Sequence, residues 1–113
     1  MKIKEIADLL NGKIIGDTNY ETESDNAFAS DLMSDVLRLT TPCAMLITGL
    51  CNMQTIRTAE MADIKIIILA RGKIADEEMI EQANDNDIII IETGYSLFKV
   101  SGILYNYGVQ PIY

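Results

Sequence analysis

Three short segments in the second half of the chain are almost purely aliphatic, and they limit the possible folds more than any other feature. They are residues 43–48 (Cys-Ala-Met-Leu-Ile-Thr), 65–70 (Lys-Ile-Ile-Ile-Leu-Ala) and 87–92 (Asp-Ile-Ile-Ile-Ile-Glu). Because none of them alternates polar with apolar residues, each is predicted to be a strand that is buried on both faces. Burial on both faces requires helices above and below the sheet, so these segments indicate an α/β fold.

A helical pattern follows each of these strands. Asn52 and Asp76 can each cap a helix, and a last helix is expected over residues 95–107. Short connections through helices give parallel neighbouring strands with right-handed crossovers. We therefore predict a three-layer α/β sandwich over residues 43–107, with a small, mainly parallel sheet.

Residues 1–42 are predicted to form an N-terminal α+β appendage to this core. Residues 3–10 place their apolar side chains on one helical face, and residues 13–16 follow as a short strand. The polar segment 17–26 is expected to be a loop, with a ragged strand near residues 20–22. Since no linker or repeat interrupts the sequence, the whole chain (1–113) is expected to be a single domain.

A second helix is expected late in the N-terminal part. Residues 27–29 (Ala-Phe-Ala) are predicted to lead into it, Ser30 to cap it and Asp31 to lie in its first turn. Pro42 ends the helical pattern, because the residue before a proline avoids the helical region.

The charge of the chain disfavours two classes of partner. Seventeen acidic residues face nine basic ones, which gives a formal net charge of −8, and the basic residues form no run. Nucleic-acid binding and attraction to anionic membranes are therefore not expected. No apolar run approaches the roughly 18 residues of a membrane-spanning helix. No signal peptide is apparent and two cysteines stand apart, so we expect a cytoplasmic protein with free thiols.

The sequence also lacks the equipment of most enzymes. It contains no histidine, which removes histidine-based nucleophilic catalysis and the usual zinc sites. No phosphate-binding loop or dinucleotide fingerprint is present. We therefore expect no catalytic residues, no metal and no cofactor.

A candidate ligand site lies where the predicted strands end. In open parallel sheets, ligands bind beyond the carboxyl ends of the strands. Polar residues and glycine at this edge are Thr48, Gly49, Asn52, Arg71 and Thr93. Arg71 is the only cation there, and free amides at a helix start near Asn52 could hold a small anion. Alternatively, Thr48 and Asn52 satisfy only backbone groups and Arg71 is a surface residue.

Ser30, Asp31 and Ser34 form a second group with two possible roles. They can belong to a capped helix in which Ser34 faces solvent, or they can form a hydroxyl and carboxylate cluster at a cleft or a dimer interface.

Residues 29–36 (Ala-Ser-Asp-Leu-Met-Ser-Asp-Val) resemble a segment of small DRTGG-domain proteins. The resemblance covers nearly the whole chain, including residues 4–16, 48–69, 76–78 and 98–105. That family is similar to the N-terminal domain of HPr kinase/phosphorylase and, more distantly, to N-terminal domains of Mur ligases. The residues that give the family its name are absent here, because residues 49–53 read Gly-Leu-Cys-Asn-Met.

The resemblance implies a regulatory, dimer-forming domain, since DRTGG domains accompany CBS domains in regulated pyrophosphatases. We therefore predict a non-catalytic regulatory or assembly module that forms a homodimer, through the last helix or the helix over residues 53–62. The alternative prediction is a sensor of a nucleotide or a phosphorylated metabolite. An interaction with another protein also stays open.

Overall fold

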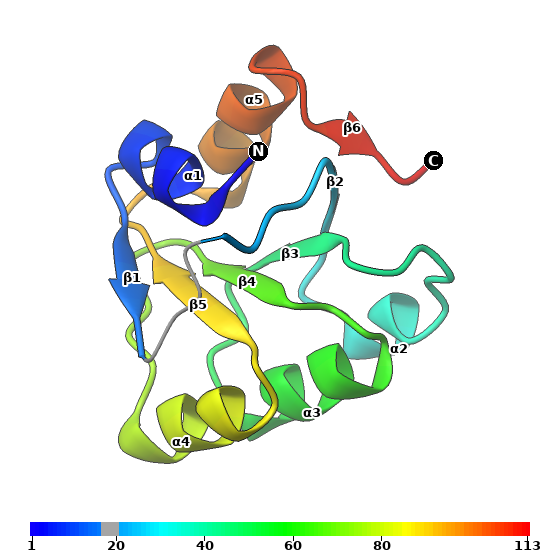
Figure 1. Cartoon of the computed structure of the whole chain (residues 1–113), viewed down its shortest axis with the longest axis vertical. Coiled ribbons are helices and arrows are strands. Elements are labelled where there is room, and N and C mark those ends of the chain that lie inside the picture. The colour runs from blue at the N-terminus through cyan, green and yellow to red at the C-terminus, as the bar shows by residue number, and fades with distance from the viewer. Residues whose placement is uncertain (17–20) are drawn as a thin grey trace.

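The computed structural model describes residues 1–16 and 21–113. Across these residues, six strands form one sheet in the order β1-β5-β4-β3-β2-β6 (Figure 1). Strands β2 to β5 are parallel, β6 runs parallel to β2, and β1 is antiparallel to β5. The strands are β1 (Lys13–Ile15), β2 (Asn26–Ala29), β3 (Met45–Thr48), β4 (Ile66–Leu69), β5 (Ile89–Glu92) and β6 (Gln110–Pro111). The predicted α/β class with a mainly parallel sheet is confirmed.

Helices cover both faces of the sheet and complete the predicted three layers. They are α1 (Ile3–Leu9), α2 (Met33–Val36), α3 (Met53–Met61), α4 (Glu77–Asp85) and α5 (Leu97–Asn106). Helices α1 and α5 lie on one face, above the sheet in Figure 1, and α2, α3 and α4 lie on the other.

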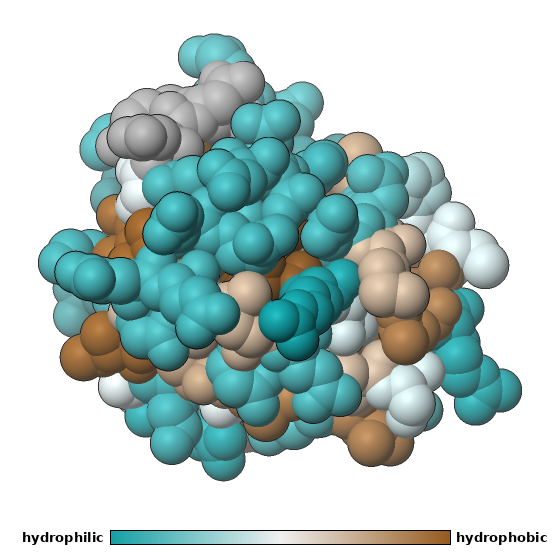
Figure 2. Space-filling model, turned by 90° about the horizontal axis from the view of Figure 1, so that it is seen from below, coloured by the Kyte–Doolittle hydropathy of each residue, from teal (hydrophilic) through white to brown (hydrophobic). Residues whose placement is uncertain are grey.

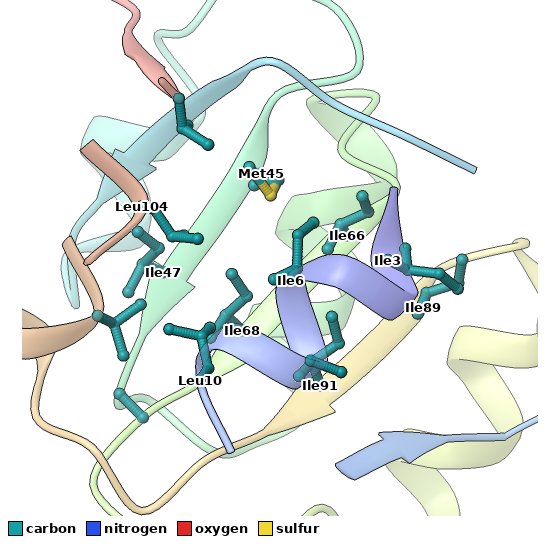
Figure 3. Close-up of a cluster of buried hydrophobic side chains, with 14 residues drawn as sticks. Ile3, Ile6, Leu10, Met45, Ile47, Ile66, Ile68, Ile89, Ile91 and Leu104 are labelled. Atoms are coloured by element: carbon teal, nitrogen blue, oxygen red, sulfur yellow. The ribbon is translucent and has the colours of Figure 1, made fainter. Parts of the chain in front are cut away.

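The aliphatic strands supply both hydrophobic cores because successive side chains point to opposite faces. In β4, Ile66 and Ile68 pack under α1 and α5, whereas Ile67 and Leu69 pack against α3 and α4. Figure 3 shows the first core, in which Ile6 and Leu10 project toward the sheet. This double burial is the reason that these segments contain no polar alternation.

The predicted helix starts are confirmed for α3 and α4. The Asn52 side chain accepts a hydrogen bond from the Gln54 N–H at 3.0 Å, and the Asp76 carboxylate accepts one from the Met79 N–H at 2.8 Å. In both cases the side chain replaces an intrahelical partner that the first turn lacks.

The prediction for residues 27–29 was wrong, because they belong to strand β2 and not to a helix. Ala27, Phe28 and Ala29 pair in parallel with Met45, Leu46 and Ile47 of β3. Pairing with a buried strand outweighs the weak local preference of three apolar residues.

Helix α2 therefore begins later than predicted. Its N-cap residue is Leu32, which has no side-chain capping bond, so Ser30 does not cap the helix and Asp31 does not lie in its first turn. Instead, the Ser30 hydroxyl accepts a hydrogen bond from the Leu32 N–H at 3.0 Å within the loop before the helix.

The ends of the chain contribute strands that flank the central three. Strand β1 confirms the predicted strand at 13–16 and lies beside β5, while β6, which follows the last predicted helix, pairs with β2 and forms the other edge. Residue 20 of the expected ragged strand lies outside the described residues. Near it, Glu23 forms an isolated antiparallel bridge with Lys2.

Candidate functional site

The Asp31 carboxylate lies at the centre of a polar cluster beyond the carboxyl ends of β3 and β4. It accepts hydrogen bonds from the Gly49 N–H at 2.7 Å and from the Thr48 hydroxyl at 3.0 Å. Its other oxygen lies 3.5 Å from Nη2 of Arg71. Four of the residues that the sequence analysis singled out are therefore in contact, and we call Asp31, Thr48, Gly49 and Arg71 the strand-end cluster.

The backbone fixes the position of Arg71. Arg71 has a left-handed conformation (φ 63°), and its N–H donates to the Tyr95 carbonyl at 2.8 Å. The guanidinium lies over Gly49 and donates to the Gly49 carbonyl at 3.2 Å. A Cβ atom at position 49 would overlap the guanidinium, so this packing requires glycine.

Thr48 connects the cluster to the loop before α3. The side chain is buried, and its oxygen accepts a hydrogen bond from the Leu50 N–H at 3.1 Å while its hydroxyl donates to Asp31. The Thr55 hydroxyl in turn donates to the Leu50 carbonyl at 2.6 Å. These bonds hold the loop after β3 in one conformation.

These contacts lower the pKa of the Asp31 carboxyl group. The main cause is the hydrogen bond from the Gly49 N–H. Partial burial raises the pKa, but the Thr48 hydroxyl and the positive charge of Arg71 lower it further. The Asp31 and Arg71 side chains are 41% and 49% exposed, so solvent reaches both members of the ion pair.

The remaining predicted site residues lie elsewhere, and the described contacts do not join them to the cluster. The Thr93 hydroxyl is buried and donates to the Leu10 carbonyl at 2.7 Å, which ties α1 to the end of β5. Asn52 caps α3, Ser30 bonds within its own loop, and Ser34 is exposed on α2.

Neither a metal site nor an activated thiol is apparent. Among the described residues, no group of three or more His, Cys, Asp or Glu side chains could hold a metal ion. Burial, followed by the negative charges of Asp76 and Glu92, raises the pKa of the Cys51 thiol. A raised pKa disfavours the thiolate, which is the reactive form.

The outer surface of α5 is a second candidate site. Phe98 is 88% exposed and Tyr105 is 68% exposed, and Gly102 lies between them with no atom within 4 Å of its Cβ position. Positions 98, 102 and 105 share one side of a helix. We call Phe98, Gly102 and Tyr105 the α5 face.

A small apolar cavity adjoins this face. Its volume is about 130 Å³, and its walls include Ala29 of β2, Ile47 of β3, Leu104 and Tyr105 of α5, and Pro111 of β6. Because strand β6 and the pairing of β2 were not predicted, this cavity could not be anticipated from the sequence.

The outer surface of α3 differs from that of α5. Its exposed residues are Gln54, Arg57, Glu60 and Met61, of which only the last is apolar. Figure 2 views the molecule from the side of α3 and α4, and most of that surface is hydrophilic. Of the two predicted interface helices, α5 is thus the more apolar. No helix in the described ranges is long and apolar enough to cross a bilayer.

Comparison with known proteins gives one informative likeness. No family model matches the sequence, and no curated protein matches it. Among solved structures, the chain is similar to the CBS and DRTGG domains of the regulatory region of Clostridium perfringens pyrophosphatase, determined with the activator diadenosine tetraphosphate. The TM-score is 0.76 at 17% sequence identity, over 97% of this chain and 47% of that one. The chain thus spans about half of that regulatory region, and this likeness in fold agrees with the resemblance to DRTGG domains that the sequence predicted.

Proposed function

We propose that this protein is a non-catalytic regulatory and assembly module that forms a homodimer through the α5 face. The observation that carries the proposal is the pair of exposed aromatic side chains, Phe98 and Tyr105, on a helix that buries Val100 and Leu104 against the sheet. Large exposed apolar groups that cluster on one helix mark interaction surfaces in soluble proteins.

The distribution of charge supports a second copy as the partner. Glu92 is the last of the 17 acidic residues, and no Asp or Glu follows it in the sequence. Lys99 is the only charged side chain of α5. Two copies with a net charge of −8 each repel one another, and the repulsion is least where neither surface carries carboxylates.

Symmetry gives the aromatic residues suitable partners. In an antiparallel pairing of two α5 helices, Phe98 of each copy lies opposite Tyr105 of the other, and Gly102 near the crossing point allows close approach of the backbones. The cavity of about 130 Å³ beside Tyr105 then receives the Phe98 ring. A protein cavity of about 150 Å³ accommodates benzene.

Sedimentation velocity over a micromolar concentration series tests the dimer. We expect a concentration-dependent dimer in the wild-type chain. A protein that remains monomeric up to about 100 µM would contradict the proposal, because a dissociation constant above that value corresponds to a binding free energy of less than about 5.5 kcal/mol.

A second candidate function is a sensor of small ligands at the strand-end cluster. It is favoured by the convergence of Arg71, Thr48 and the Gly49 N–H at the strand ends, where α/β proteins bind ligands. The similar Clostridium perfringens region was determined with a nucleotide activator. A thermal-shift panel of nucleotides and sugar phosphates tests it, since a ligand that binds only the folded state raises the melting temperature.

Free thiols at Cys43 and Cys51 agree with a reducing, cytoplasmic environment. The fold itself does not specify an activity, so the non-catalytic role rests on the chemistry of the site. In the strand-end cluster the Thr48 hydroxyl donates to the Asp31 carboxylate, but Thr48 is buried and its oxygen is already engaged by the Leu50 N–H, and the α5 face contains no carboxylate; this favours binding over catalysis.

A further inference from the structure

Asp31 makes the contacts that a bound anion would make. A backbone N–H, a hydroxyl and a guanidinium converge on its two oxygens, at 2.7, 3.0 and 3.5 Å. We propose that Thr48, Gly49 and Arg71 form an oxyanion site that Asp31 occupies from within the chain, and that a phosphoryl group enters by displacing this carboxylate. The proposal rests on the sensor function. It specifies that the ligand carries a phosphoryl group and that this group binds by displacing Asp31.

The three donors suit a phosphoryl group. Guanidinium, hydroxyl and backbone N–H groups are those that bind phosphate oxygens in proteins, and arginine matches the geometry of both carboxylate and phosphate. Arg71 directs one nitrogen toward both Asp31 and the Gly49 carbonyl. An anion with three oxygens and a higher charge can engage the remaining guanidinium donors, which Asp31 does not reach.

The donors are held in place independently of Asp31. Thr48 is paired with Leu69 within the sheet, and Arg71 is fixed by its backbone bond to Tyr95 and by its side-chain bond to Gly49. When Asp31 leaves, the site is already organised, so an incoming anion need not order it.

The weakest of the Asp31 contacts is the one with Arg71. One carboxylate oxygen is held by the Gly49 N–H at 2.7 Å, but the other lies 3.5 Å from Arg71, longer than the 2.7–2.9 Å of a strong charge-assisted bond, and the side chain is 41% exposed. Exposed ion pairs contribute little to stability, so an external anion can compete with this one.

Displacement of Asp31 has a structural consequence. Asp31 belongs to the loop that joins β2 to α2, and α2 is a four-residue helix without a side-chain cap. Once Asp31 is released, the loop loses its side-chain contacts with the rest of the strand-end cluster, while the Ser30 N–H bond to the Ile47 carbonyl still holds the start of the loop to β3. Ligand binding is thereby converted into a change at the surface of the domain.

The full-length Asp31→Ala variant tests the proposal, with inorganic phosphate as the probe and chloride at equal ionic strength as the control. We expect saturable stabilisation by phosphate and a shift of the Gly49 amide NMR signal. The apparent affinity should exceed that of the wild type by about tenfold or more, because the internal carboxylate leaves only a fraction of wild-type sites open. The double variant Asp31→Ala/Arg71→Ala should lose the response.

Two outcomes would overturn the proposal: no saturable phosphate response in Asp31→Ala, or an equal response when Arg71 is also absent. Asp31→Asn keeps an acceptor oxygen and serves if the alanine variant fails to fold. ATP and glucose 6-phosphate are tested in the same way to identify which kind of molecule carries the phosphoryl group. Adenosine, which has no phosphate, is the control. If a nucleotide stabilised the wild type and the Asp31 and Arg71 variants equally, that result would support the sensor function but would exclude the strand-end cluster as its binding site.

Discussion

The carboxylate of Asp31 lies 3.5 Å from the guanidinium of Arg71, although the two residues come from the ends of different strands. Asp31 follows β2 and Arg71 follows β4, and the intervening strand β3 contributes Thr48 and Gly49 to the same cluster. The cluster thus joins three adjacent strands at their carboxyl ends.

The contacts of Asp31 predict a pH dependence. Its pKa is lowered on folding, so its charged form contributes stability at pH values above the unfolded pKa of about 3.9. This contribution is lost as the pH falls through the lower folded pKa. Urea unfolding of the wild type and of Asp31→Asn should give a stability difference that is constant from pH 5 to pH 7 and shrinks in acid. A difference that does not change down to pH 2 would show that the charge is not involved.

Replacing Thr48 by valine should destabilise the fold. The change keeps the shape of the side chain but leaves the Leu50 N–H without its acceptor and removes one donor from Asp31. We expect a loss of about 1–3 kcal/mol in the free energy of unfolding. The matched control is Ser34→Ala on the exposed surface of α2, which should stay within about 0.5 kcal/mol of the wild type.

The packing of Arg71 over Gly49 predicts a coupled pair. In Gly49→Ala, the new Cβ overlaps the guanidinium and displaces it. The same substitution in an Arg71→Ala background meets no such obstacle. Its cost in unfolding free energy should therefore be smaller there than in the wild-type background, by about 0.5–3 kcal/mol. A double-mutant cycle measured by chemical denaturation provides this difference. Additive effects would mean that the two residues do not constrain one another.

Phe98→Glu should dissociate the proposed dimer. A carboxylate in place of each ring would face the apolar cavity beside Tyr105 of the other copy and would leave a charge there without a partner, and we expect at least about a tenfold weaker association. Because Phe98 is 88% exposed, the fold should persist, which circular dichroism checks. Met61→Glu on α3, at 73% exposure, is the control and should sediment as the wild type does.

Gly102→Ala should have opposite effects on folding and association. The Cβ position of Gly102 is open, so alanine should stabilise the helix by about 0.8–1.0 kcal/mol. In the dimer the same methyl group keeps two helices apart and weakens their association. Thermal unfolding at low protein concentration and sedimentation at high concentration separate the two effects. A variant that gains stability and also dimerises more strongly would place Gly102 outside the interface.

The aliphatic strands could be predicted from the sequence because burial on both faces leaves an unmistakable local signal. Strand β2 could not, since its residues are only partly buried and three apolar residues fit a helix equally well. The meeting of Asp31 with Arg71 was also beyond prediction, because it depends on the order β4-β3-β2 and not on sequence spacing. Arg71 was identified by its charge and its position next to a strand end, whereas Asp31 was identified as a carboxylate in the expected first turn of a helix.

The placement of β2 has a consequence for how the two candidate sites affect one another. One end of this four-residue strand leads directly to Asp31, and Ala27 and Ala29 along it line the cavity that is proposed to receive Phe98 of a second copy. Two equilibria that share one short, rigid element are thermodynamically linked, and any such linkage is reciprocal. If binding of a phosphorylated compound shifts β2, it also shifts the equilibrium between monomer and dimer. The apparent dissociation constant of that compound must then vary with the protein concentration.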